Sequence, residues 1–207
     1  MDINAIFDPD NAVWSFLLKL YYLAFAGLLW IVCSLPIITI GCATSALYSY
    51  CFAVLEGREA YILRTYFSAF RRTFKQSTLG FLLMAALAAF LTFDAYFFLQ
   101  FAPSLFFVAL GLFLIVLLFS TQFFALTAIM HTSFSKLVHI TFIMTFKHAA
   151  TSLTVLLCFF LFLTLLYFFP ITILFSAGPL CMLASLFLRS LYQREQIWDA
   201  SIFITKV

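Results

Sequence analysis

The sequence predicts an all-α fold, a polytopic transmembrane helical bundle of about six spans with one or two interfacial amphipathic helices. The composition indicates this fold, because 66% of the 207 residues are hydrophobic and only 9% are charged, whereas about 25% of a soluble domain is charged. The mean hydropathy is +1.14. The apolar residues fall into uncharged stretches of about 20, the length that a helix needs to cross a bilayer. One transmembrane domain over residues 1–207 is expected.

Six apolar segments are predicted to cross the membrane, joined in pairs by short turns at Pro36, Pro103 and Pro170. The predicted spans are residues 13–35, 37–55, 79–101, 104–130, 152–169 and 171–188. The more polar segments 56–78 and 131–150 lie between the pairs and are predicted to be cytoplasmic loops.

The positions of the basic residues predict the orientation. Ten of the eleven Lys and Arg residues fall in the two polar loops or the C-terminal tail, and Lys19 at the start of the first span is the exception. The three proline turns contain none. Because Lys and Arg are retained on the cytoplasmic side, we expect both termini in the cytoplasm and an even number of spans. Residues 1–10 contain no basic residue, unlike a secretory signal, so the first span is expected to remain.

The loop 56–78 carries an amphipathic pattern. Aromatic and aliphatic residues recur every three to four positions, and the basic residues of the opposite face are Arg64, Arg71, Arg72 and Lys75. This pattern predicts a helix on the membrane surface, whose partners are the anionic headgroups of the cytoplasmic leaflet. Such a helix either anchors the topology or docks a cytoplasmic protein.

A further pattern concerns helix packing. In the second span, small residues recur every four positions, at Gly41, Ser45, Ser49 and Ala53. They line one helix face and predict close helix packing in lipid.

Residues 70–75 and 142–147 share the pattern F-x-x-T-F-K, each ahead of a predicted pair of spans. They are either copies of one parallel repeat or a chance similarity in a chain with 30 Phe.

Asp94 is the only acidic residue well inside a predicted span. Counted from Leu79, it lies about 22 Å up a hydrocarbon core of about 30 Å. Ionising a carboxyl group in lipid is costly, so such residues are candidates for function; otherwise Asp94 reaches the outer headgroups or donates a hydrogen bond while protonated. The polar residues expected at the same depth, which would form a binding site with it, are Thr39, Thr44, Thr172 and Ser176.

The sequence offers no catalytic motif. It contains no Gly-rich phosphate loop, G-x-S-x-G or H-E-x-x-H, and its three His residues lack nearby carboxylates. Gln122, near the inner end of the fourth span, is expected to form interhelical hydrogen bonds. We therefore predict no enzymatic activity, no catalytic residue, no metal, no cofactor and no nucleic-acid partner.

Two segments resemble the YesL family of bacterial membrane proteins. One is Phe7-Asp8-Pro9-Asp10-Asn11 followed by the L-P-I-I-T-I-G turn at 35–41, and the other is residues 61–76. The chain departs from the family at Ala26-Gly27, where Asn is frequent, and at Tyr66, where Asp is frequent. The resemblance implies a bacterial plasma membrane location and an association with ABC-type carbohydrate uptake, and it implies no established activity.

Together these observations predict a non-enzymatic accessory protein of carbohydrate uptake, with ABC transporter components as partners. The alternative is a small transporter or channel that uses Asp94, in which a helix broken at Gly178-Pro179 lines the site. An ABC permease subunit is the weaker interpretation, because neither inner loop carries the E-A-A…G signature. A transporter requires a polar cavity that reaches Asp94.

Overall fold

The computed structural model describes residues 12–57, 61–101, 103–130, 132–168 and 173–195, in which all regular secondary structure is helical. The predicted turn at Pro170 and the Phe7–Asn11 motif lie outside these residues. The elements are α1 (Ala12–Ser34), η2 (Ile37–Thr39), α2 (Ile40–Leu55), α3 (Ile62–Phe101), α4 (Pro103–Ile129), α5 (Phe134–Lys147), α6 (Ala149–Phe168) and α7 (Ile173–Arg194).

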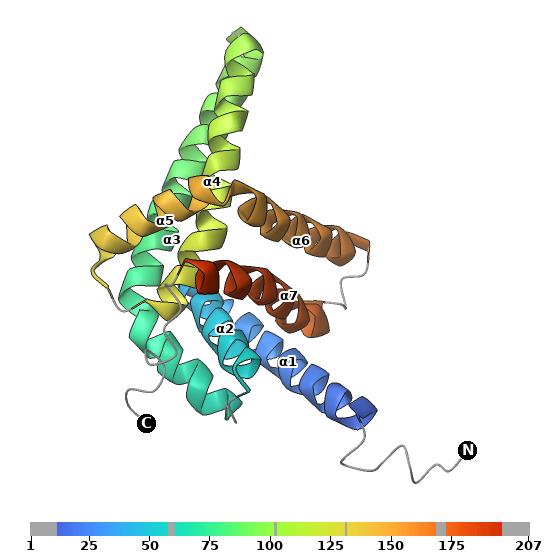
Figure 1. Cartoon of the computed structure of the whole chain (residues 1–207). Helices are drawn as coiled ribbons and strands as arrows, with labels where there is room; N and C mark the ends of the chain where they lie inside the picture. Colours follow the sequence, from blue (N-terminus) through green and yellow to red (C-terminus); the bar gives the residue numbers. More distant parts are fainter. Residues whose placement is uncertain (1–11, 58–60, 102, 131, 169–172, 196–207) are drawn as a thin grey trace.

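The helices form two groups. α3 and α4 make a long hairpin whose far end projects beyond every other element, at the top of Figure 1. α1, α2, α6 and α7 gather beside the near half of this hairpin, and α5 crosses it at mid-height (Figure 1). The described helices therefore do not run side by side as one parallel bundle.

Four described helices are long and apolar enough to cross a membrane, at Leu17–Ser34, Ile37–Leu55, Ile62–Gln100 and Leu105–Ile129. α5 and α6 together add a fifth candidate if they form one broken span. The all-helical prediction is confirmed, with several helices of membrane length. The structure does not show the predicted count of six, and α7, which ends in polar residues, is not among the candidates by length and composition.

The predicted surface helix of loop 56–78 and the predicted third span are parts of one helix of 40 residues, α3. No Pro and no Gly occurs from Ile62 to Leu79, so nothing in the backbone ends the helix at residue 78. A helix can continue where its side chains change from polar to apolar. The basic amphipathic segment thus continues directly into the apolar half of α3.

The predicted loop 131–150 is also mostly helical. α5 fills it up to Lys147, and α6 begins at Ala149 rather than at residue 152. His148 between them leaves the helical region, with φ −122° and ψ 46°, and the chain bends by 93° there. The two F-x-x-T-F-K segments therefore differ in structure, since residues 70–75 lie inside a continuous helix and residues 142–147 end at this bend.

α2 is the central helix of the described fold. In an apolar stretch of 18 residues at α2, 67% of the residues are buried, against 6% in the corresponding stretch of α3 and 11% in that of α4. Its small residues allow this position, and the buried ones include Gly41, Ser45, Ser49 and Ala53. A Cβ atom added to Gly41 would lie 2.6 Å from Cβ of Phe81, and the hydroxyls of Ser45 and Ser77 are hydrogen-bonded at 2.8 Å. The small face of α2 thus lets α3 approach closely.

α1 and α7 cross at two glycines. A Cβ atom on Gly27 would lie 2.8 Å from the backbone nitrogen of Gly178, and a Cβ atom on Gly178 would overlap the carbonyl oxygen of Leu23. The obstacle is backbone, which cannot move aside as a flexible side chain can. The contact between α1 and α7 therefore requires glycine at position 178.

We predict that Gly178→Ala separates α1 from α7 and lowers the stability by about 1–3 kcal/mol, the usual range for overpacking. The matched control is Gly111→Ala in α4, where an added Cβ atom meets nothing within 4 Å, so no loss is expected. The measurement is the apparent melting temperature of each variant in detergent. Equal melting of Gly178→Ala and the wild type would contradict the crossing.

Candidate functional site

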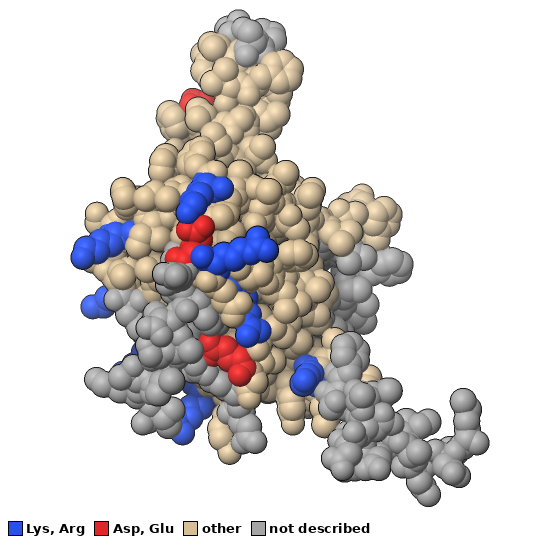
Figure 2. All heavy atoms as spheres, viewed as in Figure 1, with Lys and Arg blue, Asp and Glu red and all other residues tan. Residues whose placement is uncertain are grey.

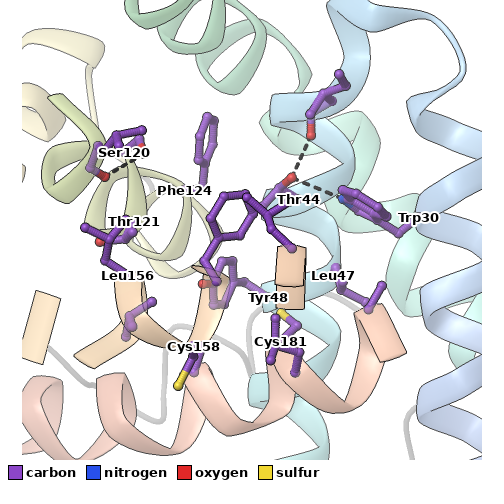
Figure 3. A pocket seen from close by; sticks show the side chains of 18 of the residues that line it. Trp30, Thr44, Leu47, Tyr48, Ser120, Thr121, Phe124, Leu156, Cys158 and Cys181 are labelled. Atoms are coloured by element: carbon purple, nitrogen blue, oxygen red, sulfur yellow. Dashed lines mark hydrogen bonds between the residues drawn. The ribbon is translucent and has the colours of Figure 1, made fainter. Parts of the chain in front are cut away.

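A cavity of about 420 Å³ lies among α2, α4, α6 and α7, with Trp30 of α1 and Phe81 of α3 also in its wall. Figure 3 shows Tyr48 and Phe124 beside this space, with Cys158 and Cys181 from the last two helices. None of the lining residues is charged, and most are apolar. The cavity is thus an apolar space between helices.

Four polar side chains of the cavity wall, Trp30, Thr44, Ser120 and Thr121, have hydrogen-bond partners. Nε1 of Trp30 donates to Oγ1 of Thr44 at 3.1 Å, and Thr44 donates to the carbonyl of Ile40 (Figure 3). Ser120 and Thr121 each donate to the backbone carbonyl three residues earlier in α4. The described part of the wall therefore offers few other donors, chiefly the hydroxyl of Tyr48, and no charged side chain, so it suits an apolar group such as an acyl chain rather than a charged substrate.

The structure does not bring the predicted intramembrane polar residues together. Thr44 lines the cavity, whereas Thr39 donates to the carbonyls of Cys33 and Pro36 in the turn before α2. Ser176 is half-buried in α7 and does not line the cavity, and Thr172 lies outside the described residues.

Asp94 lies in the projecting part of α3. The start of α2 contacts α3 at Ser77 and Phe81, and Asp94 is 13 residues further along that helix, about 20 Å away. It lines neither this cavity nor the groove at the opposite end of α2. Asp94 and Thr44 therefore do not share a site in this structure.

The predicted docking residues have different surroundings. Arg71 and Lys75 are exposed, and Arg64 lines a groove described below. Arg72 instead donates from Nη2 to the carbonyl of Ala128 at 2.8 Å. One turn later, Gln76 donates to the carbonyl of Thr132 at 2.6 Å. Arg72 thus helps to satisfy the open carbonyls at the end of α4, a role that the sequence pattern did not predict.

A buried polar cluster joins three helices. Gln122 of α4, which is fully buried, accepts from the hydroxyl of Tyr192 in α7 at 2.8 Å and donates to Oγ of Ser152 in α6 at 2.9 Å. The sequence predicted interhelical hydrogen bonds for Gln122, but its partners are 30 and 70 residues away and carry no local signal. These hydrogen bonds hold the start of α6 and the end of α7 against α4.

An ion-pair cluster holds the bend between α5 and α6. Lys147 and His148 both contact the carboxylate of Glu195 after α7, and Nε2 of His148 lies 2.9 Å from Oε1. The hydrogen bond from Lys147 is the main cause that lowers the pKa of Glu195 from its ordinary 4.5, and the hydrogen bond with His148 adds to it. The expectation that the His residues lack nearby carboxylates is therefore wrong for His148. Among the described residues, no group of three His, Cys, Asp or Glu could hold a metal ion.

Comparison with known proteins adds one match. Residues 23–95 match a family described as "Protein of unknown function, DUF624". The match runs from α1 through α2 into α3 and includes the turn at 35–41. No curated protein matches the chain, and no solved structure matches it.

We predict that Gln122→Leu lowers the stability by about 1–2 kcal/mol, because the hydroxyls of Tyr192 and Ser152 lose a buried partner. Gln193→Leu, at an exposed position of α7, is the control and is expected to be near neutral. In the double variant Gln122→Leu with Tyr192→Phe, the loss should be smaller than the sum of the single losses. Additive losses in thermal unfolding would show that the two residues do not interact.

Proposed function

We propose that this chain is a YesL-type multi-pass membrane protein without enzymatic activity, which acts by binding another membrane protein of an ABC-type carbohydrate uptake system. The match to DUF624, the domain of YesL-type proteins, supports this proposal. The motif residues at 35–41 and 61–76 support it as well. The proposed location is the bacterial plasma membrane.

The proposed topology has six spans with both termini in the cytoplasm. No Lys or Arg occurs from residue 76 to residue 130, the whole projecting part of the α3–α4 hairpin. Figure 2 agrees, since basic side chains appear over the central and lower part of this face and none on the projecting upper part of the hairpin. Because basic residues stay on the cytoplasmic side, the far end of the hairpin is proposed to face outwards.

The observation that carries the proposal is the uncovered apolar surface of this hairpin. Phe90, Phe93 and Tyr96 of α3 are 60%, 68% and 65% exposed, and Phe107 of α4 is 71% exposed. Lipid can cover such a surface, but rigid aromatic side chains also anchor protein interfaces. Gly111, with open space around its Cβ position, lets a second helix approach closely. A transmembrane helix of a partner therefore fits this surface.

The alternative, a transporter that uses Asp94, finds less support in the geometry. It requires a polar path to Asp94, and the cavity between the helices is apolar and is not lined by that residue. Of the members of the predicted polar set that the structure describes, Thr44 alone lines the cavity. We therefore favour binding over transport.

Photocrosslinking in native membranes tests the proposed interface. We expect a photoreactive phenylalanine at position 93 or 107 to give a protein adduct that contains an uptake-system subunit, because both side chains lie on the uncovered hairpin. The controls are Leu157 in α6 and Leu183 in α7, which are 60% and 50% exposed and should give lipid adducts only. Lipid adducts alone at all four positions, or adducts with a second copy of this chain alone, would contradict the proposal.

A further inference from the structure

A wide groove of about 1010 Å³ opens at the end of the molecule where α1 begins, α2 ends and α3 begins. In Figure 1 the end of α2 and the beginning of α3 lie at the lower centre, and α1 begins to their right. The described lining residues are Lys19, Tyr22, Phe25, Tyr50, Val54, Gly57, Tyr61, Ile62, Leu63 and Arg64. We call this the basic groove.

Two positive charges line the basic groove, and the described part of its wall supplies no counter-charge. Lys19 comes from α1 and Arg64 from the first turn of α3, 45 residues later, and both side chains are exposed. Neither has an ion pair or a side-chain hydrogen bond among the described residues. None of the lining residues that the structure describes is acidic. The groove therefore attracts an anion.

The start of α3 adds to this field. The backbone N–H of Thr65 donates to the carbonyl of Tyr61, at 2.9 Å, so the N–H groups of residues 62–64 precede the first helical hydrogen bond. Such groups and the positive end of the helix dipole favour an anion at a helix N-terminus. Here they lie on the same groove as the two basic side chains.

The rest of the wall is apolar or aromatic. Phe25, Val54 and Leu63 supply apolar surface, and Leu63 is 52% exposed. Tyr22 and Tyr61 are 45% and 76% exposed, and tyrosine is enriched where hydrocarbon meets the headgroups. A small soluble anion would use the charges and leave this surface unused. A molecule with a negative head and an apolar chain uses both.

We propose that the basic groove binds an anionic phospholipid, with its phosphodiester between Lys19 and Arg64 and an acyl chain against Phe25, Val54 and Leu63. Arg is well suited to this contact because its guanidinium can donate two parallel hydrogen bonds to a phosphate. A zwitterionic lipid fits less well, because its ammonium group would meet two cations. This site is independent of the proposed protein partner, which binds the opposite end of α3.

The test is lipid binding to the purified full-length chain in detergent, followed by native mass spectrometry. Phosphatidylglycerol and phosphatidylcholine of the same acyl chains are compared, and inorganic phosphate serves as the competing soluble anion. We expect phosphatidylglycerol to bind at least about tenfold more tightly than phosphatidylcholine. We also expect phosphate at the same concentration not to displace it.

Variants assign that preference to the groove. The pair Lys19→Gln with Arg64→Gln should weaken phosphatidylglycerol binding by about tenfold or more. The pair Lys75→Gln with Lys136→Gln removes the same charge from exposed positions outside the groove and should change it by less than about twofold. Lys19→Arg with Arg64→Lys keeps the charges and should keep the preference. Arg64→Gln alone, tested if the first pair does not fold, should still weaken binding measurably.

Three results would overturn the proposal. The first is an equal loss in the groove pair and the control pair, which would indicate general charge attraction. The second is displacement of phosphatidylglycerol by inorganic phosphate, which would indicate a soluble anion site. The third is a wild-type chain that does not distinguish the two lipids. Because none of these measurements includes a partner protein, they leave the hairpin proposal to its own test.

Discussion

The uncovered apolar surface of α3 and α4 is the constraint on which the rest of the structure depends. In an apolar 18-residue stretch of each helix, only 6% of the residues of α3 and 11% of those of α4 are buried inside the described fold, and in water this surface would have to be covered. In hydrocarbon it is stable, but every backbone polar group must then be satisfied within the protein. An all-helical chain meets this demand, and the described residues contain no other regular structure.

The same demand explains the polar side chains inside the fold. Gln122, Tyr192 and Ser152 bond to one another across three helices, and Arg72 and Gln76 donate to carbonyls at and beyond the end of α4. With these groups paired, close packing supplies the remaining contacts, through Gly41 against α3 and Gly178 against α1. Among the described residues, the projecting part of the hairpin and the basic groove are exposed, in addition to the apolar cavity between the helices. The hairpin and the groove are suited to molecules outside this chain, one apolar and one anionic.

The periodic, local features of the fold could be predicted from the sequence, and the long-range ones could not. The apolar runs predict helices because their composition is local, and the four-residue spacing of Gly41, Ser45, Ser49 and Ala53 predicts a face that the structure buries. The boundary between the loop and the third span was predicted at residue 78 from a change in polarity. The helix continues through this position because no Pro or Gly is present there to end it. The contacts of Arg72 with Ala128 and of Gln122 with Tyr192 depend on where distant helices cross. The depth of Asp94 along a straight span did not predict its neighbours. The start of α2 contacts α3 at Phe81, 13 residues before Asp94.

The side of the membrane reached by each end of α3 tests this account most directly. Single cysteines at Lys75 and Gln100, both exposed in α3, can be labelled with a membrane-impermeant maleimide and compared with the background of the five native cysteines. The account predicts labelling at position 100 in intact cells and labelling at position 75 only after the membrane is opened. Labelling of both positions in intact cells would contradict it.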